Sequence, residues 1–397
     1  MSTQGTPAPE DGHGSLLDGV FTMEHELFRQ TVRRFFEREI EPYYKNWERQ
    51  ENGYPLELWH KAGNAGLVGL SIPEEYGGPG CDALYGIIAV EESGRFVSGA
   101  SLGPSVFGAD SLTKLLVVSG TEEQKRKYFP GILAGEIVQT GAITEPGAGS
   151  DVNAMICRAR RDGDDFILNG QKMFVSAGMH GHLCYVVAKT NQDIERGRGH
   201  MTMFIVELDT PGITRRRLDT LGMKAGDVAE LFFDDVRVPA SAMLGPPGSA
   251  LRGPVSQIFS EDRVLLACRA LAVSELALDL TIQYTKDRIV FGKRVFDFQN
   301  TQFKLAELKA DIVIGQGFRR DLLQKFVRGT LDDLTCSAAK YWLTELEFRA
   351  THECLQLHGG YGYITETPIN KLFSFARLDT IHAGTSEIHK RNIARQL

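Results

Sequence analysis

The sequence lacks the features that mark several large classes of protein. No apolar run approaches the length of about 18 residues that a membrane-spanning helix needs. The six cysteines lie far apart and form no CxxC pair, which indicates neither a zinc site nor a disulfide framework. The formal net charge is −7, and this acidic balance argues against sequence-independent binding to nucleic acid.

Common nucleotide and metal motifs are missing as well. The sequence has no GxxxxGK[ST] phosphate loop, and no GxGxxG run of a dinucleotide-binding fold. It has no HExxH pair, and its ten histidines are scattered. We therefore expect no resident metal and no P-loop or Rossmann nucleotide site.

The N-terminal segment has a composition of its own. Residues 1–15 are rich in Gly, Pro, Ser and Thr, which predicts a disordered tail. They lack the basic start and apolar run of a secretory signal, and Glu10, Asp11 and Asp18 disfavour a mitochondrial transit peptide. The expected location is cytoplasmic.

The remaining chain divides into three blocks. Residues 16–135 carry apolar side chains at helical spacing, and residues 246–397 return to long helices, with two expected at 299–327 and 332–357. Residues 264–273 are apolar except for Arg269, which is typical of a buried helix in a bundle or subunit interface. Residues 136–245 contain short β-rich runs, and Asn169-Gly170 favours a two-residue hairpin between two of them. We expect this middle block to form a small antiparallel barrel or sandwich.

Two segments of the middle block could contact a planar ligand. Residues 142–151, AITEPGAGSD, predict a strand that ends in a glycine-rich turn, where backbone N–H groups and small hydroxyls are accessible. Residues 169–176, NGQKMFVS, place an aromatic side chain two residues before a hydroxyl. An aromatic face suits a flat ring system, although either segment alone could be an ordinary turn or a core strand.

Four further segments follow in order. They are residues 221–227 (LGMKAGD), 288–293 (RIVFGK), 356–363 (QLHGGYGY) and 381–388 (IHAGTSEI). A guanidinium group at Arg288 could bind a phosphate, and the paired glycines at 359–360 would let backbone approach one.

Together, these segments resemble the signature segments of acyl-CoA dehydrogenases over residues 22–397. The resemblance implies a mostly α fold with a central β-domain: an N-terminal helical domain, a middle β-barrel or sandwich and a C-terminal four-helix bundle. It also implies an FAD cofactor, α,β-dehydrogenation of an acyl thioester, and transfer of electrons to an electron-transferring flavoprotein. The expected assembly is a homotetramer or homodimer, because Arg288 would contact the FAD of a neighbouring subunit.

The resemblance also assigns residues to the cofactor and the substrate. Phe174 would pack on the isoalloxazine ring, and the Ser176 hydroxyl would lie near its N5 edge. Ser150 and Arg263 match positions near the substrate. The expected FAD-binding positions are Ile143, Thr144, Phe174, Ser176, Arg288, Phe291, Gln299, Gln356, Gly360, Thr385 and Glu387.

The catalytic base departs from the family pattern. Short- and medium-chain members carry a glutamate directly before the Gly-Thr of the last segment, where this chain has Ala383. Long-chain and isovaleryl members carry their glutamate directly before an arginine, where this chain has Asp262 before Arg263. We predict Asp262 as the base, with Glu261 as the alternative if the helix start shifts. The acidic pair could also merely favour a helix N-terminus, with neither residue catalytic.

Other chemistries on the same fold stay open at this stage. A flavin oxidase or monooxygenase, or a dehydrogenase of carrier-protein thioesters, would use the same cofactor. A thioester-sensing flavoprotein would bind substrate without reducing its flavin. The sequence does not fix acyl chain length or branching.

Overall fold

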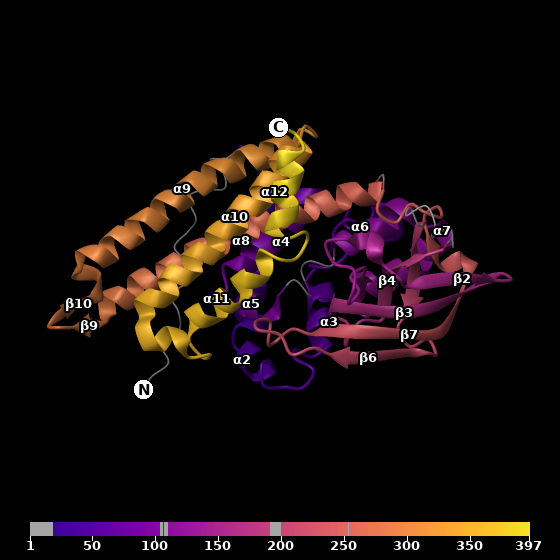
Figure 1. The fold of residues 1–397 in the computed structure, drawn as a ribbon, viewed down its shortest axis with the longest axis horizontal. Coiled ribbons are helices and arrows are strands. Elements are labelled where there is room, and N and C mark those ends of the chain that lie inside the picture. The colour runs from indigo at the N-terminus through magenta and orange to yellow at the C-terminus, as the bar shows by residue number, and fades with distance from the viewer. Residues whose placement is uncertain (1–18, 104–105, 107–109, 191–199, 253) are drawn as a thin grey trace.

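The structure, a computed structural model, describes residues 19–103, 106, 110–190, 200–252 and 254–397. The predicted disordered tail, residues 1–15, lies outside the described residues. Figure 1 shows helices, then a sheet, then long helices along the chain, which confirms the predicted mostly α fold with a central β-domain. None of the described helices is both long enough and apolar enough to cross a membrane.

The N-terminal part is helical. Its first helix begins at a capping box: the Thr22 hydroxyl accepts a hydrogen bond from the His25 N–H, and the His25 ring accepts one from the Thr22 N–H. A second capping box, from Thr121 and Gln124, begins the last helix of this part. The described helices are α1 (Met23–Phe35), α2 (Tyr44–Trp47), α3 (Glu57–Asn64), α4 (Ala83–Gly94), α5 (Val97–Leu102), α6 (Asp110–Ser119) and α7 (Glu122–Leu133).

The middle part is an eight-stranded sheet in the order β6-β7-β3-β2-β4-β5-β8, with β1 beside β4. Its pairs are antiparallel except that β1 and β2 each pair with β4 in parallel. The expected all-antiparallel pairing is therefore wrong at β4, because a long connection from β1 leads the chain back in the same direction. The strands are β1 (Gln139–Ala142), β2 (Arg158–Asp162), β3 (Asp165–Ser176), β4 (Leu183–Lys189), β5 (Met201–Glu207), β6 (Ile213–Arg217), β7 (Val228–Pro239) and β8 (Met243–Leu244).

The hairpin predicted at Asn169-Gly170 is wrong. Strand β3 runs through both residues, and the chain turns earlier, between Asp162 and Asp165, where Gly163 has φ +65°. Gly170 instead lies against Cys157, and a Cβ atom there would come within 2.8 Å of the Cys157 Cα. The glycine therefore allows two backbone segments to approach closely, which is another common reason for glycine in a strand.

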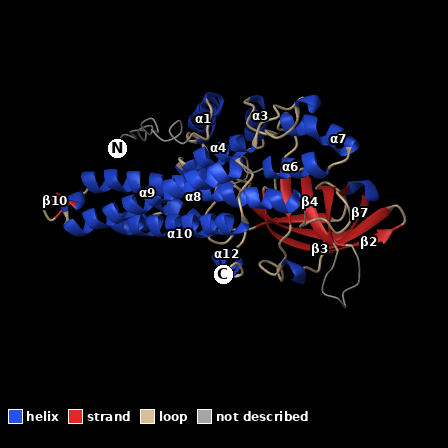
Figure 2. Cartoon of the chain, turned by 90° about the horizontal axis from the view of Figure 1, so that it is seen from above, coloured by secondary structure: helices blue, strands red, loops and turns tan. Residues whose placement is uncertain are grey.

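Three long helices form the C-terminal part and lie side by side in Figures 1 and 2. The predicted helix at residues 299–327 matches α9, and the one at 332–357 matches α10 within one residue at each end. Helices α11 and α12 pack against α10. The elements are α8 (Pro254–Asp287), β9 (Ile289–Val290), β10 (Lys293–Arg294), α9 (Gln299–Val327), α10 (Asp333–His358), α11 (Pro368–Asp379) and α12 (Ser386–Ala394).

The apolar stretch of α8 is buried in this bundle, as its sequence predicts. Its single charged residue, Arg269, is fully buried and forms an ion pair with Asp379 of α11 at 3.4 Å. The guanidinium carbon lies 3.8 Å from the ring centroid of Phe375. A buried arginine is tolerated because a carboxylate and an aromatic face replace water around it.

Candidate active site

The two segments of the middle block that we expect to contact a planar ligand lie together in the sheet. Strand β1 ends at Ala142, and the chain then passes Ile143 and Thr144 beside β3. The Lys172 Nζ of β3 donates to the Ile143 carbonyl at 2.9 Å, and the Met173 N–H donates to the Thr144 carbonyl at 2.8 Å. Residues about 30 positions apart in the sequence thus share one surface.

A buried ion pair fixes this arrangement. Lys172 is fully buried, and its Nζ lies 2.8 Å from Oε1 of the buried Glu145. The Glu145 carboxylate also accepts hydrogen bonds from the N–H groups of Ile156 and Cys157, at 2.6 and 3.0 Å. Sequence analysis did not single out Lys172 or Glu145, although both lie within the quoted segments.

Phe174 has the geometry of a ligand-binding aromatic residue. Its side chain is 63% exposed although it lies inside strand β3, and its backbone has φ +59°. The pairing of β3 with β7 shifts register between Lys172 and Val175, so Phe174 lies in a bulge. A non-glycine residue at positive φ is strained, and such strain collects at functional sites. The half-buried Ser176 follows two residues later, as a planar ring with a polar edge would require.

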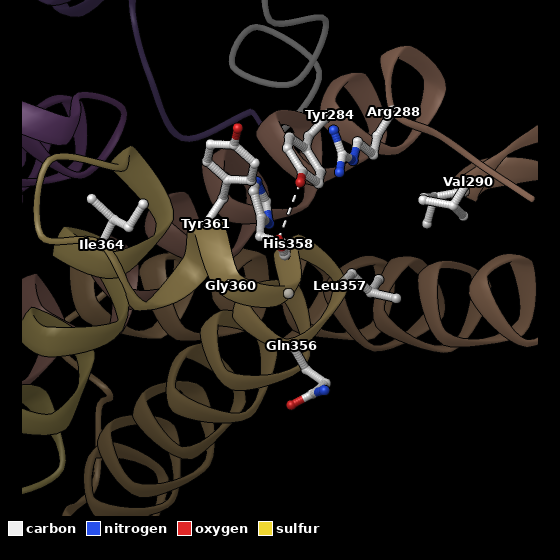
Figure 3. Close-up of a pocket in the computed structure, with 11 residues that line it drawn as sticks. Tyr284, Arg288, Val290, Gln356, Leu357, His358, Gly360, Tyr361 and Ile364 are labelled. Carbon is white, nitrogen blue, oxygen red and sulfur yellow. Dashed lines mark hydrogen bonds between the residues drawn. The ribbon is translucent and has the colours of Figure 1, made fainter.

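A second group of predicted residues lines a cavity of about 430 Å³ beside the C-terminal end of α8 (Figure 3). Arg288, Gln356 and Gly360 are among its lining residues, and the Arg288 guanidinium lies 5.8 Å from the ring centroid of Tyr361. The Tyr284 hydroxyl donates to the His358 carbonyl at 3.1 Å, which ties α8 to the end of α10. Cationic, amide and glycine groups around one hollow suit a phosphate-containing ligand.

Two more predicted residues follow Arg288 within the next eleven positions of the chain. Phe291, between β9 and β10, is 96% exposed and has φ +49°. Gln299 is exposed at the first turn of α9. An aromatic side chain with so little protein contact is free to pack on a partner or ligand.

The two groups of predicted FAD residues do not meet within one chain. Figure 1 shows β9 and β10 at one end of the long axis and the sheet with β3 at the other. Phe174 belongs to the sheet, whereas Arg288 and Phe291 lie at the β9–β10 end.

The last predicted FAD segment forms the loop before α12. Thr385 caps this helix by accepting a hydrogen bond from the Ile388 N–H at 3.3 Å, and Glu387 is exposed in its first turn. The Lys340 Nζ donates to the Gly384 carbonyl at 2.7 Å, although burial lowers the pKa of Lys340 to about 8. Ala383 has φ +51° and brings no carboxylate to the loop.

The two candidate bases on α8 have different partners on α6. Oε2 of Glu261 forms an ion pair with the Lys114 Nζ at 2.6 Å. Oδ1 of Asp262 accepts a hydrogen bond from the hydroxyl of Ser111, which is buried. Neither α6 residue could be found from sequence, because each is about 150 positions from its partner.

The environment of Asp262 shifts the pKa of its carboxyl group away from the ordinary value. Burial raises the pKa of Asp262 to about 6, with a smaller rise from the nearby Glu261. The Ser111 hydrogen bond and the charges of Lys114 and Arg263 oppose this rise. A carboxylate with a pKa of about 6 is mostly ionised at neutral pH and is a stronger base than an ordinary aspartate.

The two predicted substrate residues lie apart in the sequence and differ in exposure. Ser150 is exposed at the end of the glycine-rich turn, and Arg263 is half-buried beside Cys336 of α10.

One motif match in the N-terminal part has another explanation. Residues 99–103 spell GASLG, the GxSxG pattern of serine hydrolases. Ser101 lies in α5, not at a strand-to-helix turn, and its buried hydroxyl donates to the Glu48 carboxylate at 2.6 Å. The serine therefore has a structural role. Within the described ranges, no cluster of three or more His, Cys, Asp or Glu residues is arranged to hold a metal ion.

Family models match nearly the whole chain. The N-terminal, middle and C-terminal domains of acyl-CoA dehydrogenase match residues 22–136, 140–236 and 254–397. The chain is 40% identical over 379 residues to the long-chain specific acyl-CoA dehydrogenase of rat mitochondria, covering 95% of this chain and 87% of that protein. The chain belongs to the acyl-CoA dehydrogenase family.

Solved structures agree with this membership. An acyl-CoA dehydrogenase from Geobacillus kaustophilus superposes with a TM-score of 0.89 at 38% identity, over 95% of this chain and 98% of that one. A glutaryl-CoA dehydrogenase from Mycobacterium smegmatis in complex with FADH2 superposes with a TM-score of 0.84 at 28% identity, over 96% and 95%. As an acyl-CoA dehydrogenase, this chain is an oxidoreductase acting on CH–CH bonds, and its cofactor is FAD.

Proposed function

We propose that this acyl-CoA dehydrogenase removes the α-proton of its thioester substrate with Asp262. The observation that carries the proposal is a half-buried carboxylate on α8 whose pKa is raised to about 6. The competing position in the last segment is Ala383, which has no ionisable group. Glu261 is neutralised by Lys114, which makes it the weaker candidate.

The position of Asp262 along α8 supports this role. Phe259, one turn before it, borders the hydrophobic cluster that Ile143 also borders. Leu265, one turn after it, packs against the cluster that contains Ala177, the residue after Ser176. Both neighbouring turns of α8 thus pack in clusters that include residues next to the two proposed ring-contacting segments, which supports a place for Asp262 near the flavin.

Each residue then has a distinct task in the reaction. Bound FAD supplies the acceptor for the hydride that leaves the β-carbon. Asp262 takes the α-proton, so that loss of a proton and a hydride leaves a trans-2-enoyl thioester. Phe174 would hold the ring plane, and Ser176 would donate a hydrogen bond to its polar edge. Thr144 and Thr385 are proposed to complete the cofactor contacts.

We infer that each FAD site is shared between two copies of the chain. Phe174 lies in β3 of the sheet, whereas the cavity around Arg288 lies at the β9–β10 end of the long axis, yet both carry features of the same cofactor site (Figure 1). Self-association with a closed symmetry would bring one copy's sheet to the other copy's bundle end. A homodimer, or a homotetramer built from two such dimers, satisfies this requirement.

The substrate and the electron acceptor are proposed more broadly. An acyl-CoA of long chain is the first substrate to test, because the rat relative is named long-chain specific. An electron-transferring flavoprotein is the proposed acceptor, as the sequence resemblance implies.

The test is anaerobic bleaching of the flavin by acyl-CoAs of several chain lengths at pH 8. Asp262→Asn should retain FAD absorbance and the wild-type assembly but fail to bleach, because an amide cannot take the proton. Glu261→Gln should still bleach. Bleaching by Asp262→Asn at the wild-type rate would remove Asp262 from the mechanism, and loss of bleaching only in Glu261→Gln would transfer the role to Glu261.

A further inference from the structure

Helix α6 connects the proposed base to the flavin-binding part of the sheet. On one side it packs against α8. On its other side, Gln139 of β1 donates to the Thr113 hydroxyl at 2.8 Å, and the Leu112 side chain packs closely on Gly141. Strand β1 leads directly into Ile143 and Thr144. A displacement of α6 would therefore move the base and the cofactor contacts relative to each other.

Two side chains of α6, three residues apart, contact the two acidic residues of α8. Ser111 donates a hydrogen bond to Oδ1 of Asp262, and Lys114 forms the 2.6 Å ion pair with Glu261. Residues three apart share one face of a helix, whereas Glu261 and Asp262 are consecutive and diverge by about 100° around α8. Each acidic side chain thus has its own partner.

We propose that Ser111 and Lys114 are positioning residues that select the catalytic base. Ser111 orients the Asp262 carboxylate through Oδ1 and leaves Oδ2 for the substrate proton. Lys114 holds Glu261 in an ion pair away from that proton. This inference rests on the proposed function, and it assigns to the N-terminal domain a choice that the α8 sequence leaves open.

The same contacts set the proton affinity of the base. A hydrogen bond from Ser111 and the positive charge of Lys114 both favour ionised Asp262, whereas the negative charge of Glu261 disfavours it. Arg263 adds a favourable charge from α8 itself. Asp110, at the start of α6, accepts hydrogen bonds from the Ser71 N–H and hydroxyl and carries a raised pKa through burial.

Because these contacts either favour or disfavour ionised Asp262, removing each one should shift the acid limb of the pH–rate profile for flavin reduction in a predictable direction. Ser111→Ala should move that limb to higher pH by about one unit, since the lost hydrogen bond favours the ionised form of Asp262. Lys114→Met should move it in the same direction, and Glu261→Gln in the opposite direction. Ser111→Thr, which retains the hydroxyl, should stay near the wild-type profile.

A second measurement avoids flavin reduction. A 3-thia-acyl-CoA can lose its α-proton, but its sulfur at the β-position has no hydride to give. Its deprotonation on binding to the holoenzyme, followed across pH by absorbance, should show the same directions of shift in the same four variants. A merely structural role for Ser111 would change FAD content or melting temperature without this ordered pattern.

The outcomes separate this inference from the proposed function. If Asp262→Asn is inactive but the Ser111→Ala limb coincides with that of the wild type, Ser111 does not act on the base and the inference fails alone. The inference would also be overturned if Ser111→Ala, Lys114→Met and Glu261→Gln all moved the acid limb in the same direction. If Asp262→Asn bleaches normally, the proposed base itself is wrong.

Discussion

If each FAD site is shared between two copies of the chain, two variants that each damage a different half of the site should complement one another in FAD binding. Phe174 is exposed in β3 and Arg288 is exposed at the end of α8, so truncating either side chain removes few contacts within the chain. Phe174→Ala damages the sheet half of each site, and Arg288→Ala damages the bundle half. Each variant alone should assemble but retain little FAD, because every site in it carries one lesion.

Mixing the two variants should restore a defined fraction of sites. Random assortment of equal amounts into dimers makes about half of them mixed. In a mixed dimer, one site receives both intact halves and the other receives both lesions. About one quarter of all sites should therefore regain wild-type geometry, whereas a site contained within one chain would regain none.

The assay is flavin absorbance and bleaching after the variants are co-expressed with different affinity tags and purified through both. Doubly tagged dimers should hold about half of the wild-type flavin, since one of their two sites is intact. The matched control is the double variant Phe174→Ala/Arg288→Ala mixed with wild type, in which each mixed dimer has two singly damaged sites. Equal flavin content in the two mixtures, or none in the complementing one, would refute the shared site.

Two further predictions concern buried charges. Asp262→Asn should stabilise the protein by up to about 3 kcal/mol at pH 8 but by only about 0.6 kcal/mol at pH 4, as measured by denaturant unfolding. The reason is that a pKa raised from 3.8 to about 6 costs the folded state stability as pH rises through that interval. Equal effects at both pH values would contradict this prediction. Lys172→Met should destabilise by about 3–5 kcal/mol and reduce FAD retention, since it leaves Glu145 charged and buried; adding Glu145→Gln should recover part of the unfolding free energy, and no recovery would argue against the ion pair.

Much of the fold could be predicted because its signals are local. The apolar spacing of residues 299–327 coincides with α9, and the domain order follows from the change between helical and β-rich runs. The hairpin prediction at Asn169-Gly170 was wrong because glycine is used both in tight turns and in strands where another backbone segment approaches closely. In β3, Gly170 makes room for Cys157 across the sheet, and that neighbour cannot be seen in a local window.

The candidate site was predictable only in part, for a related reason. The segments containing Thr144, Phe174 and Arg288 could be located by residue type and order. The resemblance implied that Arg288 serves a neighbouring subunit, but how far the β9–β10 end lies from the sheet depends on how the bundle extends from it, which no local pattern encodes. The buried pair of Lys172 and Glu145 was likewise hidden among ordinary charged residues.

The identity of the base shows most clearly what a sequence leaves undetermined. Asp262 is one methylene shorter than a glutamate, so its carboxylate reaches about 1.5 Å less far from the backbone. A misplacement of about 1 Å can cost on the order of 10²-fold in rate, so the shorter side chain needs a backbone and a partner that compensate. Ser111 and the packing of α6 between α8 and β1 can supply that compensation. The neighbouring Glu261 has the length of a glutamate, but its ion pair with Lys114 occupies its carboxylate. On our proposal, the choice between the two acids is made by a helix about 150 residues away in the chain.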